Sequence, residues 1–167
     1  APVRTELVPA RDTSKIWRAH VKMPIVAIAG ARGKTTIAWM LQAIADEMRW
    51  SVGSWLSSGV YVDGDRQPGE LGPWQRVVMA ARYGELDLVV QEMAASTVVV
   101  AGLPENMYPA AIISTICGAD DHCRVSQETS LEMRSLEVLH GAIRQDGLLI
   151  GNADDALVAD YLEQHPA

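Results

Sequence analysis

One short stretch of the sequence constrains the fold more than any other. Residues 25–29, IVAIA, are wholly apolar, as expected for a strand buried on both faces of a parallel sheet. Gly30 and Gly33 follow at once, and apolar residues then recur at helical spacing from Ile37 to Met48. We therefore expect a buried strand that passes through a glycine turn directly into an amphipathic helix, as parallel α/β units do.

The rest of the chain continues this alternation. The predicted elements are strands over 51–56, 86–90, 110–116 and 147–150, a hairpin near 60–64, and helices over 74–83, 129–143 and the C-terminus. Strands alternating with helices predict an α/β fold with a mostly parallel sheet flanked by helices. Residues 1–23 show no sustained period, so we expect an N-terminal lead-in followed by a single domain over 24–167.

Composition and charge narrow the possible partners. The chain has 167 residues, of which 49% are apolar, so it can bury the core of one domain. Its 14 basic and 21 acidic residues give a net charge of −7, which disfavours a nucleic-acid surface. Cys117 and Cys123 form no CxxC pair, so neither a zinc site nor a disulfide framework is expected.

The sequence carries no membrane signal. No apolar run approaches the roughly 20 residues of a membrane span, and the first 15 residues, APVRTELVPARDTSK, hold no signal-peptide core. We therefore expect a cytoplasmic protein with no membrane partner.

The turn over residues 30–36, GARGKTT, has the composition of a phosphate-binding loop. Its glycines let the backbone approach a phosphate, and the following helix supplies N–H donors and a favourable dipole. Lys34 would reach the β- and γ-phosphates of a nucleotide, and the Thr35 hydroxyl would hold Mg²⁺. The general P-loop pattern has an earlier glycine where this chain has Ile28, and Gly30 is its nearest substitute. We predict that the chain binds ATP with magnesium.

Two acidic positions follow later strands. A P-loop needs an acid at the end of a neighbouring strand, and Glu92 is better placed for this than Asp87 within the strand. Asp121 and His122 follow the strand over 110–116, at the edge where open α/β sheets assemble ligands, and could hold a second magnesium or a phosphate. A solvated charge without function is the alternative at each position.

Four motifs, taken in this order, resemble the central ATP-binding domain of the Mur ligase superfamily. Residues 30–36 resemble its T-G-T-N-G-K-T-T loop, which also lacks the early glycine, and Glu92 before Ala95-Ser96 resembles its magnesium glutamate. Asp121-His122 resembles its D-H motif, and residues 152–155 its N-A-D-D motif. The resemblance covers residues 24 to 155 and implies a P-loop NTPase-like Mur ligase central domain, most similar to the Mur-type modules of cyanophycin synthetase and poly-γ-glutamate synthetase.

The resemblance also implies an activity and a set of site residues. Members form an amide bond with ATP through an acyl phosphate, from a carboxylate substrate and an amine. By resemblance Lys34, Glu92 and His122 would be catalytic, with Thr35 and Glu92 on the first magnesium and His122 on the second. The implied nucleotide-binding residues are Gly30, Ala31, Arg32, Gly33, Lys34, Thr35, Thr36 and Asn152.

Three departures from the family pattern bear on this interpretation. The asparagine that usually precedes the D-H motif falls near Cys117, and no lysine follows Lys34 where many members carry a carbamylated lysine. Glu137 is nearest to that position by spacing, and we expect it to be either a substitute ligand or a solvated helix residue. The sequence stops soon after residue 155, so the flanking substrate and lid domains would have to be partner domains or subunits.

These departures keep two other functions open. The chain could be a stand-alone nucleotide-binding module, or a partner-dependent one, without complete ligase activity. An unrelated small P-loop kinase or GTPase is a weaker alternative, because the sequence has no N-K-x-D guanine motif.

Overall fold

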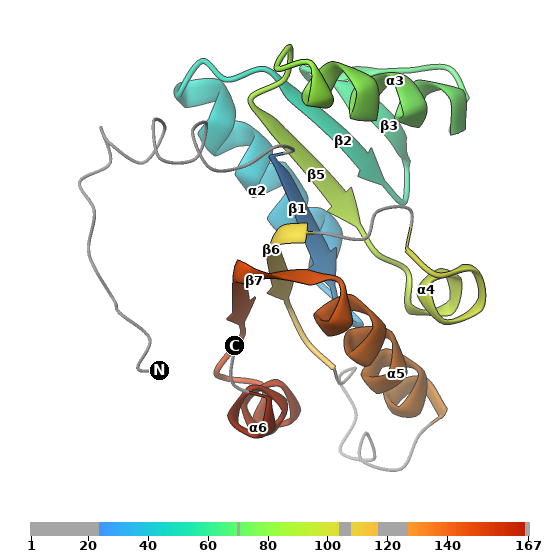
Figure 1. The fold of residues 1–167 in the computed structure, drawn as a ribbon, viewed down its shortest axis with the longest axis vertical. Coiled ribbons are helices and arrows are strands. Elements are labelled where there is room, and N and C mark those ends of the chain that lie inside the picture. Colours follow the sequence, from blue (N-terminus) through green and yellow to red (C-terminus); the bar gives the residue numbers. More distant parts are fainter. Residues whose placement is uncertain (1–23, 70, 104–107, 117–126, 166–167) are drawn as a thin grey trace.

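The computed structural model describes residues 24–69, 71–103, 108–116 and 127–165. In chain order the elements are β1 (Ile25–Ala29), α2 (Lys34–Glu47), β2 (Val52–Leu56), β3 (Gly59–Val62), β4 (Asp65–Arg66), α3 (Leu71–Arg82), β5 (Leu88–Glu92), α4 (Ala95–Ala101), β6 (Tyr108–Ile113), α5 (Gln127–Gly141), β7 (Ile143–Gly151) and α6 (Ala156–Gln164) (Figure 1). Strands and helices alternate as the sequence predicts. None of the helices in the described ranges has the length and apolar character needed to cross a membrane.

All seven strands form one mixed sheet in the order β4-β3-β2-β5-β1-β6-β7. The five strands from β2 to β7 in this order pair in parallel, whereas β3 and β4 form an antiparallel hairpin at one edge. The predicted fold class, a mostly parallel sheet flanked by helices, is confirmed. Because the parallel strands share one direction, their carboxyl ends lie along the same edge of the sheet.

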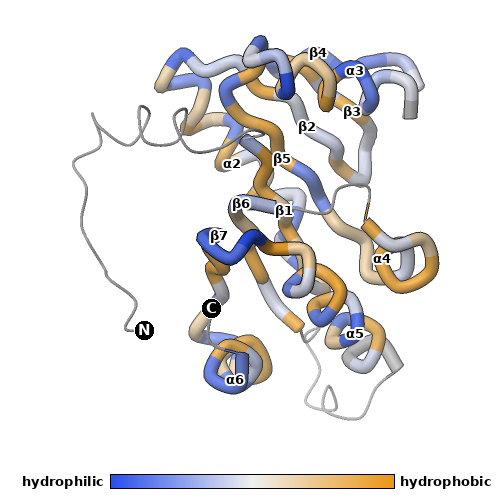
Figure 2. Tube along the Cα trace, in the orientation of Figure 1, coloured by the Kyte–Doolittle hydropathy of each residue, from blue (hydrophilic) through white to orange (hydrophobic). Residues whose placement is uncertain are grey.

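The central strand β1 explains why residues 25–29 are apolar without interruption. Successive side chains of a strand point to opposite faces, and both faces of β1 are covered. On one face Val26 and Ile28 share a core with Ala38 and Ala45 of α2. The core on the other face receives Trp74 from α3, Val98 from α4, Leu136 from α5 and Val158 from α6. Strand β1 and most of β5 are hydrophobic, whereas the carboxyl end of β5 is hydrophilic (Figure 2).

The structure corrects two predictions around the last helices. Helix α5 already begins at Gln127, so the capping-box spacing that starts at Thr129 lies inside the helix. The helix ends at Gly141, and Ile143 belongs to β7 instead of the predicted helical stripe. The apolar residues on both sides of Gly141 share one core, which makes the strand residue look like a continuation of the helix pattern.

Three further predictions change around β5 and β6. Asp87 lies just before β5 instead of within it, where its carboxylate accepts a 3.1 Å hydrogen bond from Ser51 N. Strand β6 begins at Tyr108 and ends at Ile113, because Ser114 and Thr115 turn toward a neighbouring loop. Helix α4 was not predicted, since three consecutive valines favour a strand by local preference.

Gly53 of β2 offers a test of the packing between the sheet and α3. A Cβ at this position would lie 2.4 Å from Val77 Cγ1 and 2.9 Å from Leu86 Cδ1, and both of those side chains are buried. We expect Gly53→Ala to lower the free energy of unfolding in urea by about 1–3 kcal/mol, because the core must shift to admit the methyl group.

Gly72 provides the matched control, since a Cβ there meets nothing within 4 Å. Gly72→Ala should leave stability unchanged or raise it slightly, because alanine is the better helix former. Equal stability of the two alanine variants would show that this interface is looser than the structure indicates.

Candidate functional site

The glycine loop joins β1 to α2 at the carboxyl edge of the sheet. Gly30 and Gly33 have φ angles of +121° and +82°, a backbone conformation that residues with a side chain rarely adopt. A Cβ on Gly30 would lie 2.4 Å from Thr115 O and 2.5 Å from Ser114 Oγ. Gly33 is the N-cap of α2 and contributes no side-chain hydrogen bond to it. The amides of the first turn, which have no intrahelical acceptor, therefore face the loop without a capping side chain.

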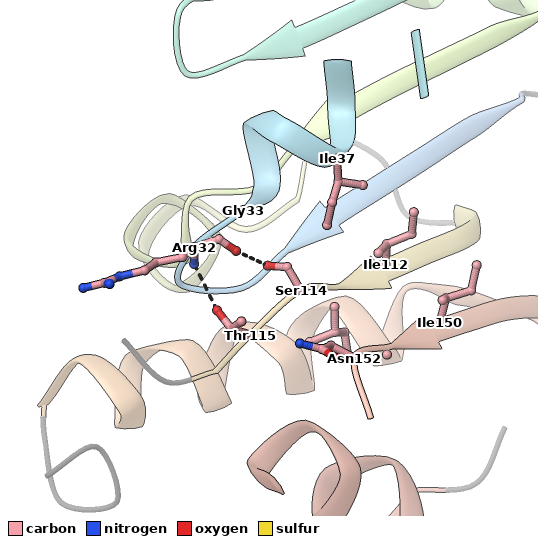
Figure 3. Close-up of a pocket in the computed structure, with 10 residues that line it drawn as sticks. Arg32, Gly33, Ile37, Ile112, Ser114, Thr115, Ile150 and Asn152 are labelled. Carbon is pink, nitrogen blue, oxygen red and sulfur yellow. Dashed lines mark hydrogen bonds between the residues drawn. The ribbon is translucent and has the colours of Figure 1, made fainter. Parts of the chain in front are cut away.

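The residues after β6 hold this loop in place. Ala31 N donates to Thr115 O at 2.7 Å, and Arg32 N donates to Thr115 Oγ1 at 3.1 Å. In return Ser114 Oγ donates to Arg32 O at 2.5 Å (Figure 3). The sequence analysis missed both residues, although two hydroxyl side chains directly after an apolar strand were a signal. Because the Ala31 and Arg32 amides already donate hydrogen bonds to Thr115, the backbone N–H groups of the loop that remain for a ligand are those from Gly33 onward.

The predicted lysine, threonine and glutamate meet where α2 begins. Lys34 Nζ donates to Gly30 O at 2.6 Å, so the ammonium group lies over the loop. Thr35 Oγ1 lies 3.0 Å from Glu92 Oε1 and 2.9 Å from Oε2. The β1–β5 register, which pairs Ile28 with Glu92, places the carboxylate at this position.

Ser57 is a further member of the site that the sequence analysis missed. Its backbone N–H donates to Glu92 Oε2 at 2.9 Å, and its hydroxyl oxygen lies 3.5 Å from Thr35 Oγ1. Ser57 directly follows β2, which is the neighbour of β5 in the sheet. Thr35 and Ser57, from two segments distant in sequence, therefore converge on the Glu92 carboxylate.

The Thr35–Glu92 pair has the donor chemistry of a magnesium site. Hydroxyl and carboxylate oxygens are hard ligands, and Mg²⁺ in nucleotide sites typically takes one or two protein ligands besides phosphate and water. The described part of the chain contains no group of three or more histidine, cysteine, aspartate or glutamate side chains that could form a cage. The pair therefore suits an ion whose remaining ligands come from a nucleotide.

The predicted second metal site falls largely beyond the region that can be described. Asp121, His122 and Cys117 lie outside the described residues, so the roles assigned to them stay predictions. Glu137 is exposed on α5. Burial, and to a lesser extent the charge of Glu137, raises the pKa of Tyr161 on α6. The Glu137 carboxylate thus acts on α6, and the structure gives it no contact with Thr35 or Glu92 among the described residues.

Asn152 lies in the same cavity as the glycine loop. The cavity has a volume of about 410 Å³ and is lined by Arg32 and Gly33 of the loop, by Ile37 of α2, and by residues at the ends of β6 and β7 (Figure 3). Asn152 N donates to Ile113 O at 3.1 Å, which fixes the end of β7 beside β6. The structure therefore brings Arg32 and Gly33 of the predicted loop together with Asn152, around a space of small-molecule size.

Asp155, the last residue of the N-A-D-D sequence, has a positioning role. Its Oδ1 accepts hydrogen bonds from Leu157 N at 2.9 Å and Val158 N at 3.2 Å, which caps α6. Its Oδ2 accepts a 3.0 Å bond from Ile116 N, so one carboxylate joins α6 to the segment after β6.

Comparison with known proteins identifies similar sequences and a similar fold. No family model matches the chain. A cyanophycin synthetase of Crocosphaera subtropica is 29% identical over 169 residues, covering 98% of this chain and 18% of that protein. The solved structure of UDP-N-acetylmuramoyl-L-alanyl-D-glutamate–2,6-diaminopimelate ligase superposes with a TM-score of 0.61 and 16% identity, over 91% of this chain and 32% of the other. The fold is that of the Mur ligase central domain, and the resemblance seen in the sequence is confirmed.

Two further solved structures of this Mur-type fold carry nucleotides. E. coli FolC in complex with DHPP and ADP matches 99% of this chain and 47% of its own, with a TM-score of 0.56 and 16% identity. A bifunctional folylpolyglutamate synthase/dihydrofolate synthase with Mn, AMPPNP and L-glutamate bound matches 97% of this chain and 47% of its own, with a TM-score of 0.53 and 16% identity. The chain spans about a fifth of the length of the curated relatives it matches.

The bond from Arg32 N to Thr115 Oγ1 provides a test of how the Mur-type loop is held. Thr115→Val keeps the shape of the side chain and removes this acceptor. We expect the Arg32 amide to exchange with solvent several-fold faster, corresponding to about 1 kcal/mol for one hydrogen bond, as measured by NMR hydrogen exchange.

The Ala31 amide is the internal control, because it bonds to the Thr115 backbone oxygen, which the substitution retains. An unchanged Arg32 exchange rate would show that Thr115 does not hold the loop through its hydroxyl group.

Proposed function

We propose that this Mur-type domain binds Mg·ATP and supports phosphoryl transfer to a substrate carboxylate, the first step of ATP-dependent amide-bond formation. The observation that carries the proposal is the convergence of Lys34, Thr35 and Glu92 at the N-terminus of α2. This arrangement offers a cation, a hydroxyl group and a carboxylate at one end of a helix whose first amides have no side-chain cap.

Different groups of the site would bind different parts of the triphosphate. The amides from Gly33 to Thr36 would receive a phosphate at the positive end of the α2 dipole. Lys34 would exchange its present acceptor, Gly30 O, for oxygens of the β- and γ-phosphates. A magnesium ion held by Thr35 and Glu92 would screen the negative charges that converge there.

The proposed reaction has two steps. A carboxylate oxygen of the substrate attacks the γ-phosphorus, the bond to the bridging β,γ-oxygen breaks, and ADP leaves. An amine then attacks the acyl carbon, the bond to the phosphate oxygen breaks, and the amine loses a proton as the amide forms. The first step brings two anions together and the second expels a phosphate anion, so Lys34 would contribute by compensating charge at the transferred phosphoryl group.

The cavity around Asn152 would receive the nucleoside end of ATP. It adjoins the loop at Arg32 and Gly33, and Ile37, Ile112 and Ile150 give it an apolar wall. Such a wall suits the face of a purine, and the Asn152 amide supplies donor and acceptor groups for its edge.

The proposal extends to the setting in which the domain works. The carboxylate and amine would be presented with the help of partner domains or subunits, and the expected location is the cytoplasm. A nucleotide-binding module without ligase activity is the second candidate, because the residues described would supply the proposed nucleotide site and identify no amine site among them. Turnover of ATP to an amide product by the assembled protein would favour the ligase.

Lys34→Ala tests the nucleotide site. We expect ATP affinity, measured by calorimetry with Mg²⁺, to fall about ten- to a hundredfold, because a charge-assisted hydrogen bond contributes about 1.5–3 kcal/mol. AMP affinity should hardly change, since AMP lacks the phosphates that Lys34 would contact.

Arg76→Ala is the matched control. It removes an exposed cation of α3 that belongs neither to the glycine loop nor to the lining of the cavity around Asn152, so ATP affinity should stay unchanged. Equal ATP affinity in wild type and Lys34→Ala would contradict the proposed site.

A further inference from the structure

Helix α2 packs on the sheet through a side other than its apolar stripe. Its buried residues are Ala38, Gln42 and Ala45. Three large apolar residues of the stripe, Met40, Ile44 and Met48, are 58%, 56% and 41% exposed. An amphipathic helix ordinarily buries its large apolar side chains against the rest of the protein. The exposed stripe therefore marks a surface that another segment or molecule can cover.

The stripe lies on the side of α2 that faces β7. Trp39, on the other flank of the helix, contacts Tyr61 of β3 with ring centroids 5.1 Å apart, so that flank faces the hairpin edge of the sheet. Ile37, the first residue of the stripe, lines one cavity together with Ile150 of β7, and Figure 3 shows both side chains pointing into it. The rest of the stripe follows Ile37 at helical spacing and continues along the same side of α2.

Strand β7 extends this apolar surface. Leu148 of β7 pairs with Ala110 of β6, which belongs to the core beneath α2. Side chains of paired residues point to the same face of a sheet, so Leu148 lies on the face that α2 covers. Leu148 is 55% exposed, and among the helices in the described ranges α2 alone contributes to the core on this face. The residues named here as the α2–β7 face are Met40, Ile44, Met48 and Leu148.

The segment that precedes β1 has the composition to cover the α2–β7 face. Residues 1–23 contain seven large apolar residues, which are Val3, Leu7, Val8, Ile16, Trp17, Val21 and Met23. This segment carries five basic and two acidic side chains, whereas residues 24–167 carry nine basic and 19 acidic ones. Glu47 is exposed three residues after Ile44, so an acidic group borders the face. Charge therefore favours residues 1–23 over a second acidic domain as the occupant.

The same segment joins the domain at one end of the face. Helix α2 leads back to the start of β2, and β2 and β1 both run parallel to β5, so Met48 lies at the same edge of the sheet as Pro24. With 14 residues, α2 is about 21 Å long. A segment of 23 residues can span that length in any conformation, because even a continuous helix would reach about 34 Å.

We propose that residues 1–23 of this chain pack on the α2–β7 face, with apolar side chains against the exposed stripe and basic side chains near Glu47. The segment would then brace the helix that carries Lys34 and Thr35 at its N-terminus. The inference goes beyond the proposed nucleotide site, because none of the four face residues lines the cavity around Asn152.

Limited trypsin digestion of the full chain, followed by mass spectrometry, measures how accessible the segment is at Arg18 and Lys22. Ile44→Asp places a charge at the centre of the face and should speed cleavage at these two sites about tenfold or more, because a docked segment would have to bury that charge. Met40→Asp serves as the disrupting variant if Ile44→Asp does not fold.

Val100→Asp is the matched control. Val100 is 86% exposed on α4, and α4 contributes Val98 to the core on the other face of the sheet. The same charge at this position should leave cleavage at the wild-type rate. Urea unfolding of each variant checks that faster cleavage does not reflect loss of the fold.

Methionine methyl NMR reads the proposed contact directly. Trp17→Ala should shift the signals of Met40 and Met48, because it removes the ring current of the indole. Met79 is the internal control, since it is 46% exposed on α3 and its signal should stay in place.

Two kinds of result would overturn the proposal. The first is equal cleavage in wild type and Ile44→Asp, or unchanged Met40 and Met48 signals in Trp17→Ala. The second is a wild-type dimer in analytical ultracentrifugation that Ile44→Asp dissociates, which would assign the α2–β7 face to a second copy of the chain.

Discussion

The close contact between Gly30 and the residues after β6 is the constraint on which the site depends. A side chain at Gly30 would collide with Thr115 O, so the loop can lie against β6 only when this residue is glycine. Ser114 and Thr115 then hold the loop through three hydrogen bonds, and α2 begins at Lys34, directly after its N-cap Gly33. The position of Lys34 and Thr35 follows from that contact.

Parallel register supplies the other half of the site. Strand β1 pairs with β5 so that Ile28 lies opposite Glu92, which brings the carboxylate to the Thr35 hydroxyl. Ser57 N, directly after the next strand, donates a hydrogen bond to the same carboxylate and fixes its orientation. The polar groups of the site thus lie at the carboxyl edge of the sheet, while the strands themselves are buried in two apolar cores.

The parts that the sequence predicted are those with a local signal. The strand, turn and helix over residues 25–47 are adjacent in the chain, and Glu92 ends an apolar run, so pattern alone identifies them. Ser57 and Thr115 could not be found in this way, because their partners lie 35 and 83 positions away and the contact depends on strand order. Helix α4 escaped prediction because its valines favour strands by local preference, whereas the burial of Ala95 and Val98 stabilises it as a helix.

The central claim is that Thr35 and Glu92 form the metal side of a nucleotide site. The most direct test is the Mg²⁺ dependence of ATP affinity in wild type and in Glu92→Gln, which keeps the shape of the side chain and removes its charge. The account predicts that Mg²⁺ strengthens ATP binding in wild type and has a much smaller effect in the variant. Superimposable magnesium titrations of the two proteins would contradict it.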